Sequence, residues 1–225
     1  MLLINPTDML RQGLIAVKIP GAEQDKKSRS SNVRVFKSYF GKHPLHLCRV
    51  FRDLQEYNLL DVELLGRELA FKGFLIGNNY LKCYANLDIQ SSLFTLGVNK
   101  TGELRWRFIT LIAGLKQFKL KMPTQAEWEA ARMLLSVDGT HARTNEPRDP
   151  NMRRNPRNFS YKNNFPGLNY QIVLHLWKNQ IAYCNSGDPA STHDITAIRE
   201  EFIGMCPENA RVVIFGLPNH DANRC

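Results

Sequence analysis

The chain has 225 residues, of which 43% are hydrophobic and 23% charged, and its formal net charge is +9 at pH 7. These values are typical of a globular protein with one large or two small domains. The basic excess predicts a polyanionic partner, nucleic acid such as DNA first and a membrane surface second. No apolar run approaches the roughly 18 residues of a membrane span. The five cysteines are widely spaced and include no C-x-x-C pair, so they support neither a zinc ribbon nor a disulfide framework. Together with an N-terminus that lacks the features of a signal peptide, they favour a nuclear or cytoplasmic protein that is not secreted.

The first part of the chain is expected to be helical after a flexible start. Residues 1–33 show little hydrophobic periodicity and include a polar stretch at 23–32, which predicts a flexible N-terminal segment. From Val35 onward, apolar residues recur at spacings of three and four. We therefore expect residues 34–122 to form a helical unit with its own core.

A helix–turn–helix candidate lies within this unit. Residues 88–94 and 100–115 are expected to form two helices around a tight turn. In that turn Gly97 would supply a positive φ, and Asn99 would cap the second helix.

The second of these helices would present basic side chains away from its apolar face. Lys100, Arg105 and Arg107 are predicted to contact DNA phosphates or base edges. The alternative is a helical hairpin whose basic side chains only face solvent.

A basic link ending at Pro123 marks the expected domain boundary, so that residues 123–225 form a second domain. The apolar run Met133–Val137 predicts a strand that ends at Asp138, with a turn at Gly139 and Thr140. A carboxylate at a strand end is placed to bind a metal, because strand ends are rigid and open into clefts. The alternative is an aspartate that only caps the turn.

A long, basic and proline-rich segment follows at residues 142–167, and we expect it to be irregular. Long loops of this kind are usually functional, and basic side chains in one can follow a nucleic-acid backbone. The aromatic side chains at 159, 161 and 165 would either stack on bases or anchor the loop to the core. The predicted nucleic-acid contacts here are Arg143, Arg153, Arg154, Arg157 and Lys162.

The remaining elements predict a short mixed sheet. Strands are expected at 168–176, 180–184 and 211–215, with a helix from Asp194 to Phe202. Such a βββαβ sheet could bring Asp138 and Asp194 to one edge. Paired carboxylates bind Mg²⁺ or Mn²⁺, which can activate water for phosphodiester hydrolysis. The alternative for Asp194 is a charge that only interacts with the helix dipole.

Several short motifs carry a resemblance to the DDE superfamily endonucleases of the PIF/Harbinger transposase type. The resemblance covers about residues 34–214 and lies in the order of its motifs. In the second domain they are Val137-Asp138-Gly139-Thr140-His141, Ser160-Tyr161-Lys162, Gly167-Leu168-Asn169-Tyr170 and Thr192-His193-Asp194-Ile195. In the helical unit they are Phe40-Gly41-Lys42-His43-Pro44, Phe74-Leu75-Ile76-Gly77 and the stretch from Leu93-Phe94 to Trp106.

The resemblance implies an α+β chain in which a helical, helix–turn–helix-like unit precedes an incomplete RNase H-like domain that cuts DNA with a divalent metal. It implies that Asp138 and Asp194 are the first two acidic metal positions. The family places a further acid at the end of the next strand, where this chain has Phe215, and a later glutamate has no counterpart here. The chain is therefore expected to be truncated and inactive, with exposed apolar surface that favours a protein partner or oligomer. The alternatives are a non-catalytic DNA-binding protein and an unrelated small enzyme with a carboxylate site.

Overall fold

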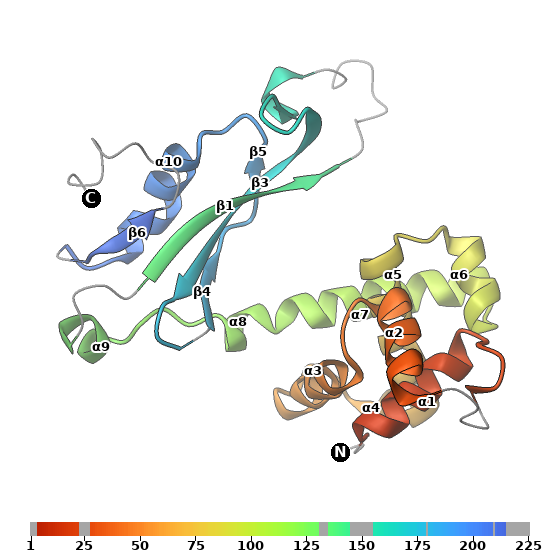
Figure 1. The fold of residues 1–225 in the computed structure, drawn as a ribbon. Coiled ribbons are helices and arrows are strands. Elements are labelled where there is room, and N and C mark those ends of the chain that lie inside the picture. Colours follow the sequence, from red (N-terminus) through yellow and green to blue (C-terminus); the bar gives the residue numbers. More distant parts are fainter. Residues whose placement is uncertain are drawn as a thin grey trace. The chain divides into compact units, whose positions relative to one another are not determined.

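The computed structural model describes residues 4–22, 28–130, 135–144, 155–178, 180–208 and 210–214. The chain divides into two compact units, Met1–Phe118 and Lys119–Cys225, each described here by itself. Helices make up the described part of the first unit, and a mixed sheet with short helices makes up that of the second (Figure 1). The mixed α+β class predicted from the sequence is therefore confirmed. The division falls a few residues before the predicted boundary at 122/123.

The helices of the first unit enclose a core rich in phenylalanine. Phe36, Phe51, Phe74 and Phe108 are fully buried there, and the Phe51 and Phe74 rings pack edge to face with centroids 5.1 Å apart. The helices are α1 (Pro6–Ala16), α2 (Arg29–Phe40), α3 (Pro44–Glu56), α4 (Val62–Leu65), α5 (Arg67–Cys83), α6 (Leu87–Phe94) and α7 (Val98–Gly114), and α8 (Lys116–Lys119) follows.

The prediction that residues 1–33 are flexible is wrong for helix α1. The Asn5 side chain accepts a hydrogen bond from the Asp8 N–H at 2.8 Å and so caps the helix. Pro6 occupies the first turn, where a missing N–H costs nothing. Met9 and Leu14 are buried in the core. The cap and these few apolar contacts fix the helix, although its sequence shows only weak periodicity.

Helices α6 and α7 lie within two residues of the predicted pair, but the turn between them differs from the prediction. Thr95, with φ 53°, takes the left-handed conformation that ends α6, and its N–H donates to the Ser91 carbonyl. Gly97 has φ −61° and is the N-cap of α7, so its predicted positive φ is wrong. Asn99 consequently lies inside the helix and does not cap it.

Helices α5 and α7 approach closely because glycine faces phenylalanine. A Cβ atom added to Gly73 would lie 2.3 Å from Phe108 Cε2, a contact that real Cβ atoms do not make. Gly102, on α7, has ordinary space around it, because its nearest neighbour would be a Leu87 methyl at 3.5 Å. The sequence pattern predicts both helices, but the absent side chain at Gly73 sets their spacing.

Two alanine substitutions test this packing. Gly73→Ala is expected to destabilise the helical unit by about 1–3 kcal/mol, because the buried Phe108 ring must move. Gly102→Ala should stabilise it by up to about 1 kcal/mol, since alanine favours helix and no atom has to shift. Urea unfolding followed by circular dichroism at the helix band measures both. If both substitutions changed the free energy of unfolding in the same direction, the close contact between Gly73 and Phe108 would be contradicted.

The second unit is a mixed sheet around a long strand, β1 (Leu135–Arg143). Along its whole length β1 pairs antiparallel with β3 (Phe165–His175), from Leu135↔His175 to Arg143↔Gly167. On its other side β1 pairs parallel with β6 (Val212–Ile214). Strands β2 (Phe159–Ser160), β4 (Gln180–Cys184) and β5 (Asp188–Pro189) all pair with β3. The short helices are α9 (Gln125–Ala130), η2 (Pro156–Asn158), α10 (Asp194–Ala197), η3 (Ile198–Phe202) and η4 (Ile203–Met205).

One face of this sheet forms the core of the unit. Leu135, Val137 and Val173 are fully buried against Ile198 and Phe202, which follow α10. The strand alternation sends the intervening side chains to the opposite face. There Leu174 is 43% exposed and its cross-strand neighbour Ile181 40% exposed. Exposed apolar side chains thus lie on this face; the predicted protein partner or oligomer remains a prediction.

Helix α9 is fixed to the turn that follows β3 by an ion pair. The Lys178 ammonium contacts the Glu127 carboxylate, whose other oxygen accepts from the Thr124 N–H at 2.9 Å. These hydrogen bonds, that of Lys178 above all, hold the pKa of Glu127 down at about 2. The ion pair thus persists over the whole physiological pH range.

Candidate functional site

Asp138 lies in the middle of a strand, and the turn predicted directly after it is wrong. The strand runs five residues further because its backbone continues to pair with β3, through Gly139↔Gln171 and on to Arg143↔Gly167. Asp138 itself pairs with Ile172, and its side chain is exposed. Its carboxylate therefore projects from the face of the sheet and not from a strand end.

Asp194 begins helix α10, as predicted, and its carboxylate lies on the sheet against Gly139. A Cβ added to Gly139 would be 2.6 Å from Asp194 Oδ1. The same Oδ1 accepts hydrogen bonds from Asn169 Nδ2 at 2.8 Å and Gln171 Nε2 at 3.3 Å. Asn169 Nδ2 also donates to the Thr192 carbonyl at 3.1 Å. We call Gly139, Asn169, Gln171 and Asp194 the aspartate clamp, because together they attach the start of α10 to the sheet.

The strand pleat separates the two predicted metal ligands. Successive side chains of a strand point to opposite faces, so Asp138 points away from the face on which Gly139 meets Asp194. Within the described ranges, no group of three or more His, Cys, Asp or Glu side chains is placed to hold a metal ion. The two carboxylates do not fit a shared Mg²⁺ or Mn²⁺ site in this arrangement, which differs from the expectation that the sheet brings them to one edge.

The aspartate clamp contains two amides that the sequence reasoning missed as functional candidates. Asn169 and Gln171 are essentially fully buried on β3. Gln171 Oε1 has no hydrogen-bond partner among the described protein atoms. A buried polar side chain is expensive unless it is bonded, so the amides are held there by Asp194. The sequence does contain a sign of these two amides, because polar residues occupy alternate positions of an otherwise apolar strand.

Three predicted DNA contacts of the second unit gather at one end of its sheet. Arg143 ends β1, Arg157 belongs to η2, and Lys162 lies in the turn between β2 and β3; all three are exposed. Arg143 pairs with Gly167 on β3, and the Arg157 carbonyl accepts from the Ser191 N–H at 3.0 Å. We call this set of cations the basic end of the sheet.

The aromatic side chains at this end divide between the two alternatives left open by the sequence. Phe159 and Phe165 are half-buried, whereas Tyr161 is 75% exposed and packs edge to face on Phe159. The Arg143 guanidinium carbon lies 6.0 Å from the Phe165 ring centroid. Arg153 and Arg154, also predicted as contacts, lie outside the described residues.

The helical unit presents only part of its predicted basic face. Arg107 is exposed, and Lys100 is held by the Glu103 carboxylate at 2.9 Å. Arg105 is only 7% exposed, so its predicted role as a phosphate contact is wrong. Its Nε donates to Gln90 Oε1 at 2.7 Å and an Nη2 hydrogen to the Ala85 carbonyl at 3.2 Å. Burial lowers the pKa of Arg105, since the charged form is desolvated.

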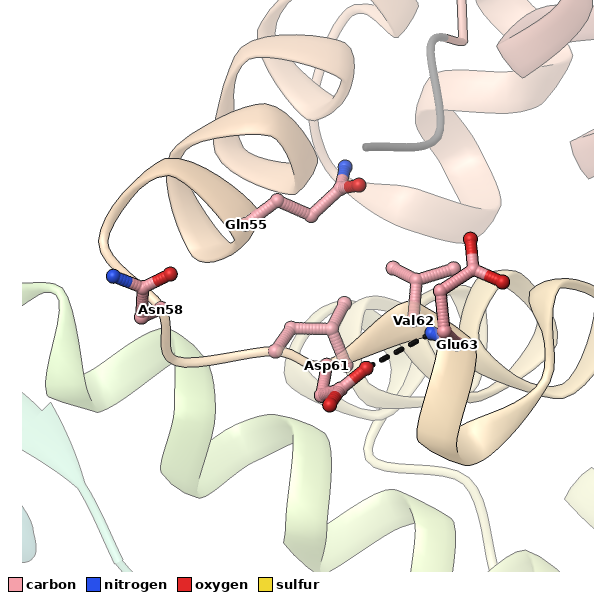
Figure 2. A pocket seen from close by; sticks show the side chains of 6 residues that line it. Gln55, Asn58, Asp61, Val62 and Glu63 are labelled. Carbon is pink, nitrogen blue, oxygen red and sulfur yellow. Dashed lines mark hydrogen bonds between the residues drawn. The ribbon is translucent and has the colours of Figure 1, made fainter.

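A pocket of about 450 Å³ in the helical unit has the wrong chemistry for a polyanion. Figure 2 shows its lining, in which the Asp61 carboxylate accepts from the Glu63 N–H at 3.0 Å. Asp61 thereby caps α4, and the Glu63 carboxylate pairs with Arg67 at 3.2 Å. Both carboxylates are used in local structure, and their charge repels phosphate. The charge around this pocket therefore does not favour a phosphate ligand.

The thiols of Cys48, which is buried, and Cys206, which is half-buried, are poor nucleophiles. Burial raises the pKa of Cys48 and of Cys206 to about 11, so both are protonated near neutral pH. Burial also raises the pKa of Cys83.

No family model, curated protein or solved structure matches this chain. In the part of the chain that the structure describes, no helix is both long and apolar enough to cross a membrane.

Proposed function

We propose that this protein binds DNA through the basic end of the sheet, on the frame of a transposase-derived DDE-type nuclease, and does not cleave the DNA it binds. The observation that carries the proposal is that three exposed cations, Arg143, Arg157 and Lys162, belong to separate elements at the same end of the sheet. Cations on a rigid sheet bind phosphates by releasing counterions from DNA. A nuclear location follows from such a partner.

The topology of the second unit supports descent from a DDE-type nuclease. Apart from the two-residue strands β2 and β5, its order is three antiparallel strands (β1, β3, β4), then α10, then β6 parallel to β1. This is the βββαβ order expected of an RNase H-like domain. The α6–α7 pair supports the helix–turn–helix-like unit that the resemblance implies before it.

Metal-dependent cleavage is the second candidate, because β6 ends beside Asp138, although the acid that the resemblance implies there is missing. Ile214 pairs with Val137, the residue before Asp138. The resemblance places an acidic residue at the next position along the chain, where this sequence has Phe215. Against cleavage, Asp138 and Asp194 lie on opposite faces of β1 and do not face one another.

Binding of a DNA duplex, measured by fluorescence anisotropy at several salt concentrations, tests the proposal. The triple variant Arg143→Gln, Arg157→Gln, Lys162→Gln should flatten the slope of log K against log salt by about 3, roughly one per lost phosphate contact. The control Arg67→Gln, Lys72→Gln removes charge from two side chains of the helical unit that are paired to glutamates, and it should keep the wild-type slope. Equal slopes for the triple variant and the wild type would overturn the assigned surface.

Plasmid nicking with Mg²⁺ or Mn²⁺ separates the two candidates. We expect the wild type and Asp138→Ala to show the same background, because the two carboxylates lie on opposite faces of β1. Nicking that requires Asp138 would replace the binding proposal with the cleavage candidate.

A further inference from the structure

The helical unit carries a group of three aromatic rings, two of them exposed, to which nothing above assigns a role. Tyr84 is 73% exposed and Trp106 is 59% exposed. Both ring centroids lie 5.7 Å from that of Tyr80, and the ring planes are inclined by about 60° to it. Tyr80 and Tyr84 lie at the C-terminal end of α5, and Trp106 is on α7. We call these three side chains the aromatic platform.

The backbone at Tyr84 shows that a large side chain is kept there at a cost. Tyr84 is the C-cap of α5 with φ 50° and ψ 34°, the left-handed conformation. Glycine or asparagine usually occupies this position, because a bulky side chain is strained there. Its exposed ring adds little to the core, so the strain is not repaid by burial. Strained backbone conformations cluster at ligand-binding positions, so the exposed Tyr84 ring is a candidate for a contact.

The platform is held in place from beneath. The Arg105 guanidinium carbon lies 4.4 Å from the centroid of the Tyr80 ring. Arg105 is itself fixed by Gln90 and the Ala85 carbonyl. Tyr80 is thus clamped on one face while Tyr84 and Trp106 remain open. Rings that are already ordered lose little entropy when they bind a flat partner.

The charge of the unit selects the kind of partner. Residues 1–118 contain 17 Lys and Arg against 10 Asp and Glu, so this unit carries most of the excess positive charge. One turn before Trp106, Glu103 is neutralised by Lys100, and Arg107 beside it is exposed. A flat partner with its own negative charge fits this surface. Single-stranded nucleic acid combines both properties, because aromatic rings stack on its unpaired bases while cations hold its phosphates.

We infer that the aromatic platform stacks on unpaired bases of single-stranded DNA, a role that rests on the proposed DNA-binding function and extends it to a second surface. The probe is an oligothymidylate of about 12 nucleotides, compared with an abasic oligonucleotide that has the same number of phosphates. Stacking predicts at least about fivefold tighter binding of the oligothymidylate. It also predicts quenching of tryptophan fluorescence, which Trp106→Phe should remove while Trp128 and Trp177 remain.

Two variants and a control test whether the aromatic platform stacks on unpaired bases. Tyr84→Gly and Trp106→Ala should each weaken oligothymidylate binding by about fivefold or more and leave the abasic affinity unchanged. Tyr84→Gly should also keep or raise the melting temperature, because it relieves the left-handed strain. Trp177→Ala, which removes a tryptophan that is 74% exposed in the other unit, should change neither affinity.

The outcomes distinguish this inference from the proposed function. If duplex binding shows the expected salt slope but the two oligonucleotides bind equally, the platform inference fails and DNA binding stands. If neither duplex nor oligonucleotide binds, both fail. If Trp106→Ala changes only the sedimentation of the protein, the platform is an interface between copies of the chain and the inference is overturned.

Discussion

Replacing Arg105 with methionine is expected to destabilise the helical unit by about 2–4 kcal/mol. The substitution leaves Gln90 Oε1 buried without its 2.7 Å donor and removes the hydrogen bond to the Ala85 carbonyl. Each buried polar atom left unsatisfied costs about 1–3 kcal/mol, and loss of the cation–π contact with Tyr80 adds about 0.5–1 kcal/mol. Methionine fills part of the space and removes the cost of a desolvated charge, which limits the loss.

Arg107→Met is the matched control for this prediction. Arg107 is two residues away on the same helix, carries the same charge and is exposed, so its replacement should change stability by at most about 0.5 kcal/mol. Urea unfolding followed at the helix band measures both variants. If Arg105→Met were as stable as the wild type but bound DNA more weakly, the role of Arg105 as a phosphate contact would be restored.

A third variant separates the lost hydrogen bond from lost packing. Gln90 is fully buried, and its Nε2 donates to Asn79 Oδ1 at 2.9 Å and to the Ile76 carbonyl at 3.0 Å. Adding Gln90→Leu to Arg105→Met removes the unsatisfied oxygen. The double variant should therefore lose less than the sum of the two single losses. Additive losses would show that the two side chains act independently.

Arg105 also shows how far a single helix can be interpreted from its own sequence. The extents of α6 and α7 and the apolar face through Leu104 and Phe108 follow from spacing alone. Arg105 lies beside that face, and helical spacing assigns such a residue to solvent. It is buried because α6 brings Gln90 across it, and a pattern along one helix contains no information about a side chain supplied by another.

Strand β3 shows a similar limit to what can be predicted from the sequence of one element. The strand at β3 was predictable from its alternation, but the buried side is the more polar one, with Asn169, Gln171 and His175. The more apolar side, with Ile172 and Leu174, is half-buried or exposed. Burial of the polar side follows from the arrival of Asp194 at Gly139, a contact between residues far apart in sequence. The sequence predicts that Asp138 and Asp194 share a metal site, but it contains no information about the face of the sheet on which each carboxylate lies.

Replacing Gly139 with alanine is expected to destabilise the second unit by about 2–4 kcal/mol. The new Cβ would lie 2.6 Å from Asp194 Oδ1 and 2.9 Å from Cγ, so the carboxylate must leave its place. Asn169 and Gln171 would then lose an acceptor while they remain buried, and two unsatisfied amides cost more than the steric shift alone. Gly204→Ala is the control, because nothing lies within 4 Å of its added Cβ. Thermal unfolding of the purified chain measures both variants.

The combination with Asp194→Ala tests whether the loss arises in the aspartate clamp. Each single substitution removes the hydrogen bonds that Asn169 and Gln171 donate to Asp194. The double variant should therefore be no less stable than the less stable of the two single variants. If Gly139→Ala instead left stability unchanged, the Asp194 carboxylate would be free to move without loss. The aspartate clamp would then contribute nothing to stability, although Asp138 would still lie on the opposite face of β1. The stability of this one variant therefore decides whether the Asp194 carboxylate holds α10 on the sheet.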